Sequence, residues 1–408
     1  MDILIEELEE SLWAAALQDG LLVGLEADPS LEEVRWGSIY WARIKSIDKA
    51  LDAAFLDLDG FNTGILYNND ARITEASGKI VKGGEKPIGK IFQPGDMVAV
   101  QAKSAYLAAE EDDYARRETK TPQMSMDITL PGRYMVFCPM VCENRISRRI
   151  RDKKMRGRLR KMLDEIDSLQ GFILRMAAAN TQTDVLLREG KIMQAMWKDI
   201  SRHFEGQEAG LIALGPDAIE RTLSDQAGRR IDRIEVVTMD HYKHVEEWCS
   251  IFAPDLVTKI QPVEIKHAED DLALFHERDI IGQIESLFQS YALLPGGGNL
   301  IIQNAAALTA IDVNQGGDKD SRLGINIQAA KETARQLRLR NCGGIIVIDF
   351  LKMKDKAAEK KLIAVLEDAV NEDPCTVQIH GFTKLGLLEM TRKRRTPPLQ
   401  DRFSSFIA

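Results

Sequence analysis

The stretch Leu308–Gly317, LTAIDVNQGG, places an acid and an amide two positions apart in a run that otherwise has the composition of a buried strand. Because side chains alternate between the two faces of a strand, Asp312 and Asn314 project to the same side. A buried carboxylate without a partner costs several kcal/mol or takes up a proton. The stretch therefore predicts a strand whose polar residues serve a purpose that offsets this cost.

A second acid, Asp349, ends the apolar run GIIVIDF of residues 344–350 in the same way. Acids at the ends of neighbouring strands converge readily on one point, and two carboxylates with an amide oxygen suit a hard cation such as Mg²⁺. Another interpretation stays open, because Asp often caps a strand end or begins a turn. We expect nearby Asp318 and Asp320 in a solvated loop and at a helix N-cap rather than as ligands, although Asp318 can contribute an outer contact to the site.

The residues around these acids alternate between strand and helix patterns. Gly298–Asn314 predicts a hairpin of two strands, and residues 325–340 predict a helix that ends where Gly343 or Gly344 adopts a left-handed conformation. The elements predicted after it are a strand at residues 344–350, a helix at 356–370, a strand at 375–380 and a helix with a basic end at 385–394. This order predicts a layered α/β domain with a mixed sheet.

The preceding part of the chain has a different pattern. Apolar and polar residues alternate from Trp36 to Tyr67 between Gly and Asp turns, which predicts a small all-β unit with a further strand at residues 96–103. Strand character resumes at residues 132–141, and helices and strands mix after Arg151. The predicted fold class is therefore multidomain, with α/β and α+β parts.

Length and composition indicate a multidomain globular protein. A chain of 408 residues is longer than one ordinary domain, and no apolar run approaches the roughly 18 to 20 residues that a membrane span needs. The N-terminus is acidic where a secretory leader is basic. Five scattered cysteines fit a reducing compartment better than a disulfide framework. We therefore expect a cytoplasmic protein without a membrane span.

The net charge of −9 is unevenly distributed along the chain. Residues 1–33 carry ten acids and no Lys or Arg, whereas Ser147–Lys161 holds nine basic residues against one acid and Thr391–Arg395 holds four. Such runs can neutralise phosphates whatever the total charge is. The first run fits a solvated helix face equally well.

Several long motifs resemble those of one family. ALTAIDVN, AKETARQLRLRNCGGIIVIDF and GLLEMTRKR resemble the catalytic region of the RNase E/G family of bacterial endoribonucleases. WGSIYWARI with LDAAFLDL resembles that family's S1 domain, and LPGRYMVFCP followed by ISRRI resembles the start of its 5′-sensor region. The resemblance runs from about Arg35 to Pro398 and is weakest between Asp184 and Leu272.

The resemblance implies a division of the chain into domains. In order, these are an N-terminal segment that packs with an RNase H-like subdomain (1–33), an S1-like, OB-like β-barrel (34–125), a 5′-sensor region (126–220), the RNase H-like subdomain (221–287), a DNase I-like α/β catalytic domain (288–400) and a tail (401–408).

The resemblance also implies catalytic roles. Asp312 and Asp349 match the family's two magnesium-binding aspartates, and Asn314 matches the asparagine that orients the first of them. In the family, the metal activates water for in-line attack on an RNA phosphodiester, which leaves a 3′-hydroxyl and a 5′-monophosphate. This chemistry needs a metal to lower the pKa of its water and to offset charge on the phosphate.

The RNA-binding roles that the resemblance implies fall into two groups. The residues expected to contact RNA bases or backbone are Phe55, Lys120, Arg148 and Arg149, although Phe55 taken alone fits a barrel core better, and Arg148 and Arg149 fit helix-surface charges equally well. The residues expected to hold a 5′-terminal monophosphate and its base are Gly132, Val136 and Arg175. Two departures weaken these expectations: Ile65 stands where the family has a second aromatic residue, for which Phe61 or Tyr67 can substitute, and Met176 stands where it has a threonine hydroxyl.

A further departure concerns assembly. Relatives carry a Cys-Pro-x-Cys zinc link after the catalytic domain, and this chain has no such cysteines before it stops at Ala408. We therefore expect Mg²⁺ and no structural zinc, and a homo-oligomer, if one forms, that is not zinc-linked. The expected partner is single-stranded RNA, from an rRNA precursor or an mRNA; the alternative is a protein that binds single-stranded RNA without cleaving it.

Overall fold

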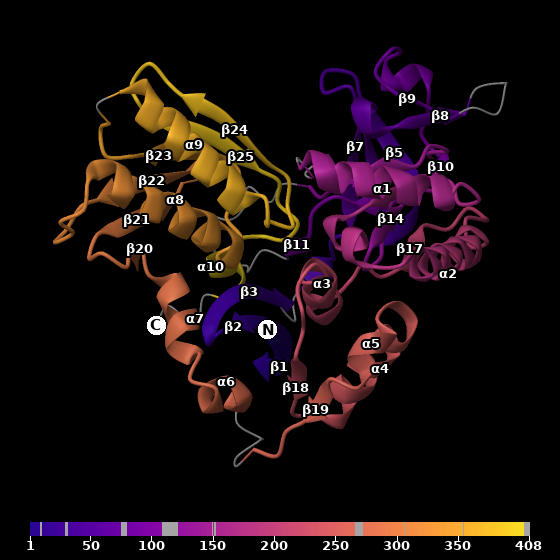
Figure 1. Cartoon of the computed structure of the whole chain (residues 1–408). Coiled ribbons are helices and arrows are strands. Elements are labelled where there is room, and N and C mark those ends of the chain that lie inside the picture. Colours follow the sequence, from indigo (N-terminus) through magenta and orange to yellow (C-terminus); the bar gives the residue numbers. More distant parts are fainter. Residues whose placement is uncertain are drawn as a thin grey trace. The chain divides into compact units, whose positions relative to one another are not determined.

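The computed structural model describes residues 1–8, 10–28, 32–74, 80–107, 121–148, 150, 152–265, 272–305, 307–353 and 355–403. The chain divides into two compact units (Figure 1). The first comprises Met1–Asp2 and Ser30–Val263, and the second Ile3–Pro29 and Glu264–Ala408. In the described part of the chain, no helix is long and apolar enough to cross a membrane.

The first unit contains a closed five-stranded barrel. Its strands are β5 (Ile39–Asp48), β6 (Ala53–Asp57), β7 (Thr63–Tyr67), β12 (Gln123–Ser125) and β10 (Met97–Ala102). The ring closes because β10 pairs with both β12 and β5. Alternate apolar side chains such as Ala54, Leu56 and Leu66 fill the interior. This confirms the predicted all-β unit.

Short elements surround the barrel. They are β4 (Glu32–Val34), η1 (Asn68–Asp70), β8 (Arg72–Thr74), β9 (Ile80–Lys82), η2 (Ile88–Lys90), β11 (Tyr106–Leu107) and β17 (Gly210–Ala213). Of these, β17 pairs with β5 along the outside of the barrel sheet.

A second core of the first unit combines a small sheet with helices. The sheet has the order β13 (Leu130–Pro131), β14 (Met135–Phe137), β16 (Phe172–Leu174) and β15 (Arg145–Ile146). The helices are α1 (Lys153–Glu165), η3 (Met176–Asn180) and α2 (Thr183–Ser201). Buried residues from all of these elements share one apolar cluster. The rest of this unit consists of α3 (Ala218–Asp225), β18 (Arg233–Val236), α4 (Met239–Phe252), α5 (Pro254–Val257) and β19 (Ile260–Pro262).

The second unit is built on a six-stranded mixed sheet. Its order is β20 (Tyr291–Leu293), β21 (Asn299–Asn304), β22 (Leu308–Asn314), β23 (Gly344–Asp349), β25 (Leu388–Arg392) and β24 (Val377–Phe382). β22 and β23 are parallel, and the other neighbours are antiparallel. Helices α8 (Arg322–Leu339) and α9 (Lys356–Val370) pack their apolar residues against one face (Figure 1). The predicted hairpin and mixed sheet are confirmed.

N-terminal strands belong to the same unit. They are β1 (Asp2–Leu8), β2 (Ser11–Gln18) and β3 (Leu21–Asp28), and the remaining elements of this unit are α6 (Ala273–Glu277), α7 (Ile281–Glu285), η4 (Ser286–Phe288) and α10 (Leu399–Arg402). Arg335 and Arg338 of α8 donate to the carbonyl oxygens of Leu22 and Val23, each at 3.0 Å. These bonds fix β3 to the helix.

Two sequence predictions are wrong in this unit. Residues 385–394, predicted as a helix, form a turn and the strand β25, because Leu388, Met390 and Arg392 alternate inward while Glu389 points outward. Gly344 does adopt a positive φ of 89°, as predicted, but it does so at the start of β23; the residue with left-handed conformation directly after α8 is Asn341, with φ 51°. Asn tolerates this conformation because its short polar side chain can bond locally.

Candidate functional site

Strand register places the two catalytic candidates side by side. Asp312 of β22 is the register partner of Asp349 in the parallel strand β23. On these strands Ile311, Val313 and Ile348 are buried against the helices. Since side chains alternate, Asp312 and Asp349 both point to the opposite face, where they are exposed.

Asn314 contacts the first of these acids directly. Its Nδ2 donates to Oδ2 of Asp312 at 3.0 Å. The bond occupies one carboxylate oxygen and restricts the rotamer of Asp312, as outer partners do for metal-binding carboxylates. The structure therefore brings together the three residues that the sequence singled out at strand ends.

The donor set fits a hard divalent cation. Two exposed carboxylates on adjacent strands supply charged oxygens, and Mg²⁺ is commonly held by one or two carboxylates while it keeps several waters and contacts phosphate. Among the described residues, no group of three or more His, Cys, Asp or Glu side chains is arranged to hold a metal. An ion held by Asp312 and Asp349 would therefore leave most coordination positions to water and substrate.

The turn after Asn314 is fixed by a buried acid. Asp318, predicted in a solvated loop, is only 6% exposed. Its carboxylate accepts bonds from the backbone N–H of Asp320 and from Nε2 of Gln328, and a Cβ at Gly296 would collide with it. The N-cap of α8 is Ser321 rather than Asp320. The sequence prediction was wrong at both acids: contacts with Gly296 and with Gln328 of α8 bury Asp318, and the cap position falls on Ser321, one residue after Asp320.

In the first unit, two of the predicted sensor residues lie in contact. Arg175 donates through Nη1 to the carbonyl oxygen of Gly132 at 2.8 Å and to Oγ of Ser224 at 2.6 Å. Its Nη2 lies 3.3 Å from Asp225. Val136 lies on β14, which pairs with the β16 strand preceding Arg175. A phosphate arriving at Arg175 must therefore compete with Asp225.

Sequence reasoning missed a buried acid that lies behind this cluster. Glu189 of α2 is 3% exposed, and its carboxylate accepts the backbone N–H of Tyr134 at 3.0 Å. Burial raises the pKa of Glu189 to about 7, although backbone hydrogen bonds and the nearby Arg175 oppose this shift. A Cβ at Gly132 would collide with Oε1 of Glu189. The available signal was its helical spacing with Leu186 and Met193, which are also buried.

Comparisons with known proteins agree with these motifs. The model of the Ribonuclease E/G family matches residues 129–395. The chain belongs to the Ribonuclease E/G family. The protein named Ribonuclease G of Escherichia coli (strain K12) is 29% identical over 401 residues, which cover 96% of this chain and 80% of the relative. Ribonuclease E of Haemophilus influenzae is 31% identical over 97% of this chain and 42% of its own length.

The remaining residues predicted to contact RNA differ in their exposure to solvent. Phe55 is half-buried and lies opposite Ile65, which is 6% exposed. Phe61, on the turn between β6 and β7, is 95% exposed and can offer a ring face to a base. Arg148 is exposed. Lys120 and Arg149 lie outside the described residues.

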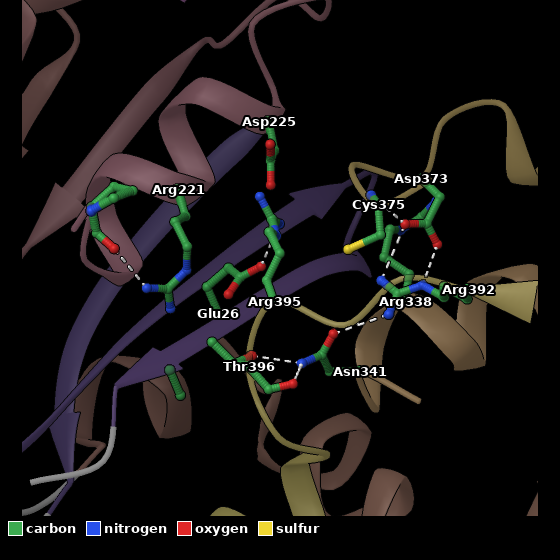
Figure 2. A network of polar contacts seen from close by, with 12 residues as sticks. Glu26, Arg221, Asp225, Arg338, Asn341, Asp373, Cys375, Arg392, Arg395 and Thr396 are labelled. Carbon is green, nitrogen blue, oxygen red and sulfur yellow. Dashed lines mark hydrogen bonds and ion pairs between the residues drawn. The ribbon is translucent and has the colours of Figure 1, made fainter. Parts of the chain in front are cut away.

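The second basic run of this Ribonuclease E/G member is largely structural, contrary to the phosphate-neutralising role that the sequence suggested. Figure 2 shows Arg392 against Asp373, with Nε–Oδ2 at 2.8 Å, and both side chains are 2% exposed. Arg395 pairs with Glu26 at 3.0 Å. Asn341 joins this network by accepting from Nη1 of Arg392 and donating to Thr396.

A turn that was missed in the sequence lies at the same sheet end as Asp349. Residues 383–387 connect β24 to β25, and β25 begins at Leu388 opposite Ile348. Lys384 is exposed and Leu385 is 88% exposed on this turn. Residues 385–387 of this turn fall within the helix that the sequence predicts, although Gly386, with φ 90°, is a turn signal. Lys384 is the cation of this turn and a candidate for contact with a substrate phosphate.

Proposed function

We propose that this chain is a magnesium-dependent endoribonuclease that hydrolyses single-stranded RNA. The observation that carries the proposal is the register pairing of Asp312 with Asp349, together with the bond from Asn314 to Asp312. The relatives that match most of the chain are named ribonucleases. A site of two exposed carboxylates on adjacent strands, one of them oriented by Asn314, suits phosphodiester hydrolysis, whereas a protein that only binds RNA has no need of it.

In this mechanism, Asp312 and Asp349 would hold Mg²⁺, and the bond from Asn314 keeps Asp312 in the rotamer suited to it. When bound, the ion lowers the pKa of a coordinated water and offsets charge on the phosphate. Lys384, exposed on the neighbouring turn, adds a positive charge near the same sheet end. Water attacks phosphorus in line with the P–O3′ bond: its oxygen bonds to phosphorus and the P–O3′ bond breaks. The 3′ oxygen takes up a proton from solvent while the attacking water gives one up, which leaves a 3′-hydroxyl and a 5′-monophosphate.

The substrate is held by contacts that do not depend strongly on sequence. Phe55 and the exposed Phe61 are placed on the barrel, where aromatic rings can stack on unpaired bases. Recognition of a 5′-monophosphate by Gly132, Val136 and Arg175 is weak, because Arg175 already contacts Asp225 and Met176 offers no hydroxyl. The RNAs are rRNA precursors or mRNAs, and the enzyme acts in the cytoplasm.

The test is to replace each acid by its amide. Asp312→Asn and Asp349→Asn are each expected to abolish cleavage of a labelled AU-rich single strand with Mg²⁺ present, while the affinity for RNA stays nearly unchanged. Asn314→Ala is expected to lower the rate by about 10- to 100-fold, as for other outer partners of metal ligands. The control Glu389→Gln neutralises an exposed carboxylate on β25 and is expected to keep wild-type cleavage.

Two outcomes contradict the proposal. Retained cutting by both acid-to-amide variants would remove the metal site from the reaction. RNA binding by the wild type without any cleavage, at any Mg²⁺ concentration, would favour the alternative of a non-cleaving RNA-binding protein.

A further inference from the structure

Helix α1 has one face made almost entirely of basic side chains. Residues 153–161 contain six Lys or Arg and no acid. Five of these side chains are exposed and form what we call the α1 basic face: Lys153, Lys154, Arg158, Arg160 and Lys161. On the opposite side Leu159 and Met162 are buried in the core of the first unit, so the helix is firmly anchored.

Nothing within the described part of the chain balances this charge. None of the five residues forms an ion pair with another described residue, whereas the sixth, Arg156, donates to the carbonyl oxygens of Ser147 and Ile150. Acids of the helix, Asp164 and Glu165, come only at its C-terminal end. The positive charge of the face is therefore left to solvent or to a ligand.

The charge pattern is unfavourable for the helix itself. Asp152 caps the N-terminus and accepts from the backbone N–H of Met155. The first turn itself, however, carries Lys153 and Lys154 and no acid, although the positive end of the helix dipole favours acids there. Lys154 and Arg158 are four residues apart, where like charges repel. Repulsion of this kind, with no ion pair to the five cations among the described residues, is typical of functional surfaces.

The composition of the face favours a polyanion over a folded protein. Among the exposed large apolar side chains of the described residues, none belongs to α1, whereas the centres of protein interfaces are depleted of charge and enriched in aromatic residues. Lys154, Arg158 and Lys161 form a row about 10 Å long on one side of the helix. A row of cations without apolar anchors is suited to a phosphate backbone.

The α1 basic face lies near residues that are proposed to contact RNA. α1 packs against β15 and against η3, which begins directly after Arg175. We propose that the α1 basic face binds the phosphodiester backbone of RNA without sequence preference, beside the cluster of Gly132 and Arg175. This inference rests on the proposed function only in taking RNA as the polyanion.

The test measures how RNA affinity depends on salt. The variant K154Q/R158Q/K161Q and the wild type are each titrated against a labelled, unstructured oligoribonucleotide with a 5′-hydroxyl, in the presence of EDTA. Fluorescence anisotropy gives the dissociation constant at each of several salt concentrations. Each phosphate contact on a single strand contributes about 0.7 to the slope of log K against log salt. The variant is expected to lose about two units of slope and to bind more weakly at low salt.

A matched control carries the same charge change elsewhere. K356Q/K360Q/K361Q removes three exposed cations of α9, a helix that also carries Glu359 and Glu367. This variant is expected to keep the wild-type slope. Thermal unfolding of the α1 variant is expected at the wild-type temperature or above, because like charges have been removed, so that unfolding cannot account for weaker binding.

Three outcomes are decisive. Equal slopes for the α1 variant and the wild type, or equal losses in the α1 and α9 variants, would overturn the inference. The same proteins are also titrated with polyglutamate as a model of an acidic protein. If the α1 variant binds RNA like the wild type but no longer binds polyglutamate, the face is assigned to an acidic protein and the inference is overturned. Conversely, a wild type that never cleaves RNA but shows the expected change in slope would refute the proposed function and support this inference.

Discussion

Two basic runs of this chain have similar compositions and opposite environments. In α1 every cation except Arg156 is exposed, and the exposed ones form no ion pairs within the described residues. In Thr391–Arg395, Arg392 is buried against Asp373 and Arg395 pairs with Glu26. Charge density along the sequence therefore does not reveal whether cations serve a ligand or the fold, since the decision depends on which acids tertiary structure brings to them.

The pattern around each run explains the difference. In β25, Arg392 points inward, to the same side as Leu388 and Met390 of this alternating strand. Its charge must therefore be matched inside the unit. In α1, the apolar positions are filled by Leu159 and Met162, and every cation except Arg156 is directed outward. A buried cation needs a partner, and an exposed one does not.

The largest effect is expected on breaking the buried pair. Arg392→Ala leaves the carboxylate of Asp373 buried without its partner, and removal of one member of a buried ion pair costs about 3 to 5 kcal/mol. The free energy of unfolding, measured by urea denaturation, is expected to fall by this amount. The exposed Arg160→Ala is the matched control and is expected to change it by about 0.5 kcal/mol or less.

A double variant sharpens this test. Arg392→Met with Asp373→Leu removes both charges and is expected to recover much of the lost stability, since apolar replacements of buried pairs are often tolerated. If Arg392→Ala unfolds no more easily than Arg160→Ala, the contrast between the two runs is refuted.

The second effect concerns an acid that lies between arginines but pairs with neither. Near Glu189, Arg175 contacts Asp225 and Arg133 pairs with Asp255, and burial raises the pKa of Glu189 from 4.5 to about 7. An acid whose pKa is raised on folding stabilises the fold below its ordinary pKa, and this contribution is lost as the pH rises through about 7. The wild type should therefore lose stability over this window.

Glu189→Gln removes the titration while it keeps an acceptor for Tyr134. Relative to this variant, the wild type is expected to lose roughly 3 kcal/mol of unfolding free energy between about pH 4.5 and about pH 7.5. Denaturation curves for both proteins across this range provide the measurement. A difference between them that stays constant with pH would show that Glu189 is charged throughout.

The sequence predicted the elements in which pattern alone decides the outcome. Alternation placed Asp312 and Asn314 on one face, and the parallel register with Asp349 matches that expectation. It failed for residues 385–394, where the apolar Leu385 and Leu387 of the turn conceal the alternation of the strand. It also missed Glu189 and Asp318, because burial of an acid depends on residues far away in sequence, such as Gly132 and Gly296.

The smallest expected change in unfolding free energy comes from a substitution at a glycine of α1. Gly157 lies in the middle of the helix, and a Cβ there would meet nothing within 4 Å, so packing does not require glycine. Gly157→Ala is expected to raise the free energy of unfolding by about 0.5 to 1 kcal/mol, because glycine loses more conformational freedom in a helix. Denaturation measures this gain directly.

Gly190 of α2 provides the contrast, since a Cβ there would collide with the buried side chain of Leu169. Gly190→Ala is therefore expected to lose the gain or to destabilise the protein. Because Gly157→Ala changes no charge, the salt dependence of RNA binding should stay that of the wild type. A more stable Gly157→Ala protein that binds RNA more weakly would mean that the backbone of α1, and not only its cations, approaches the nucleic acid.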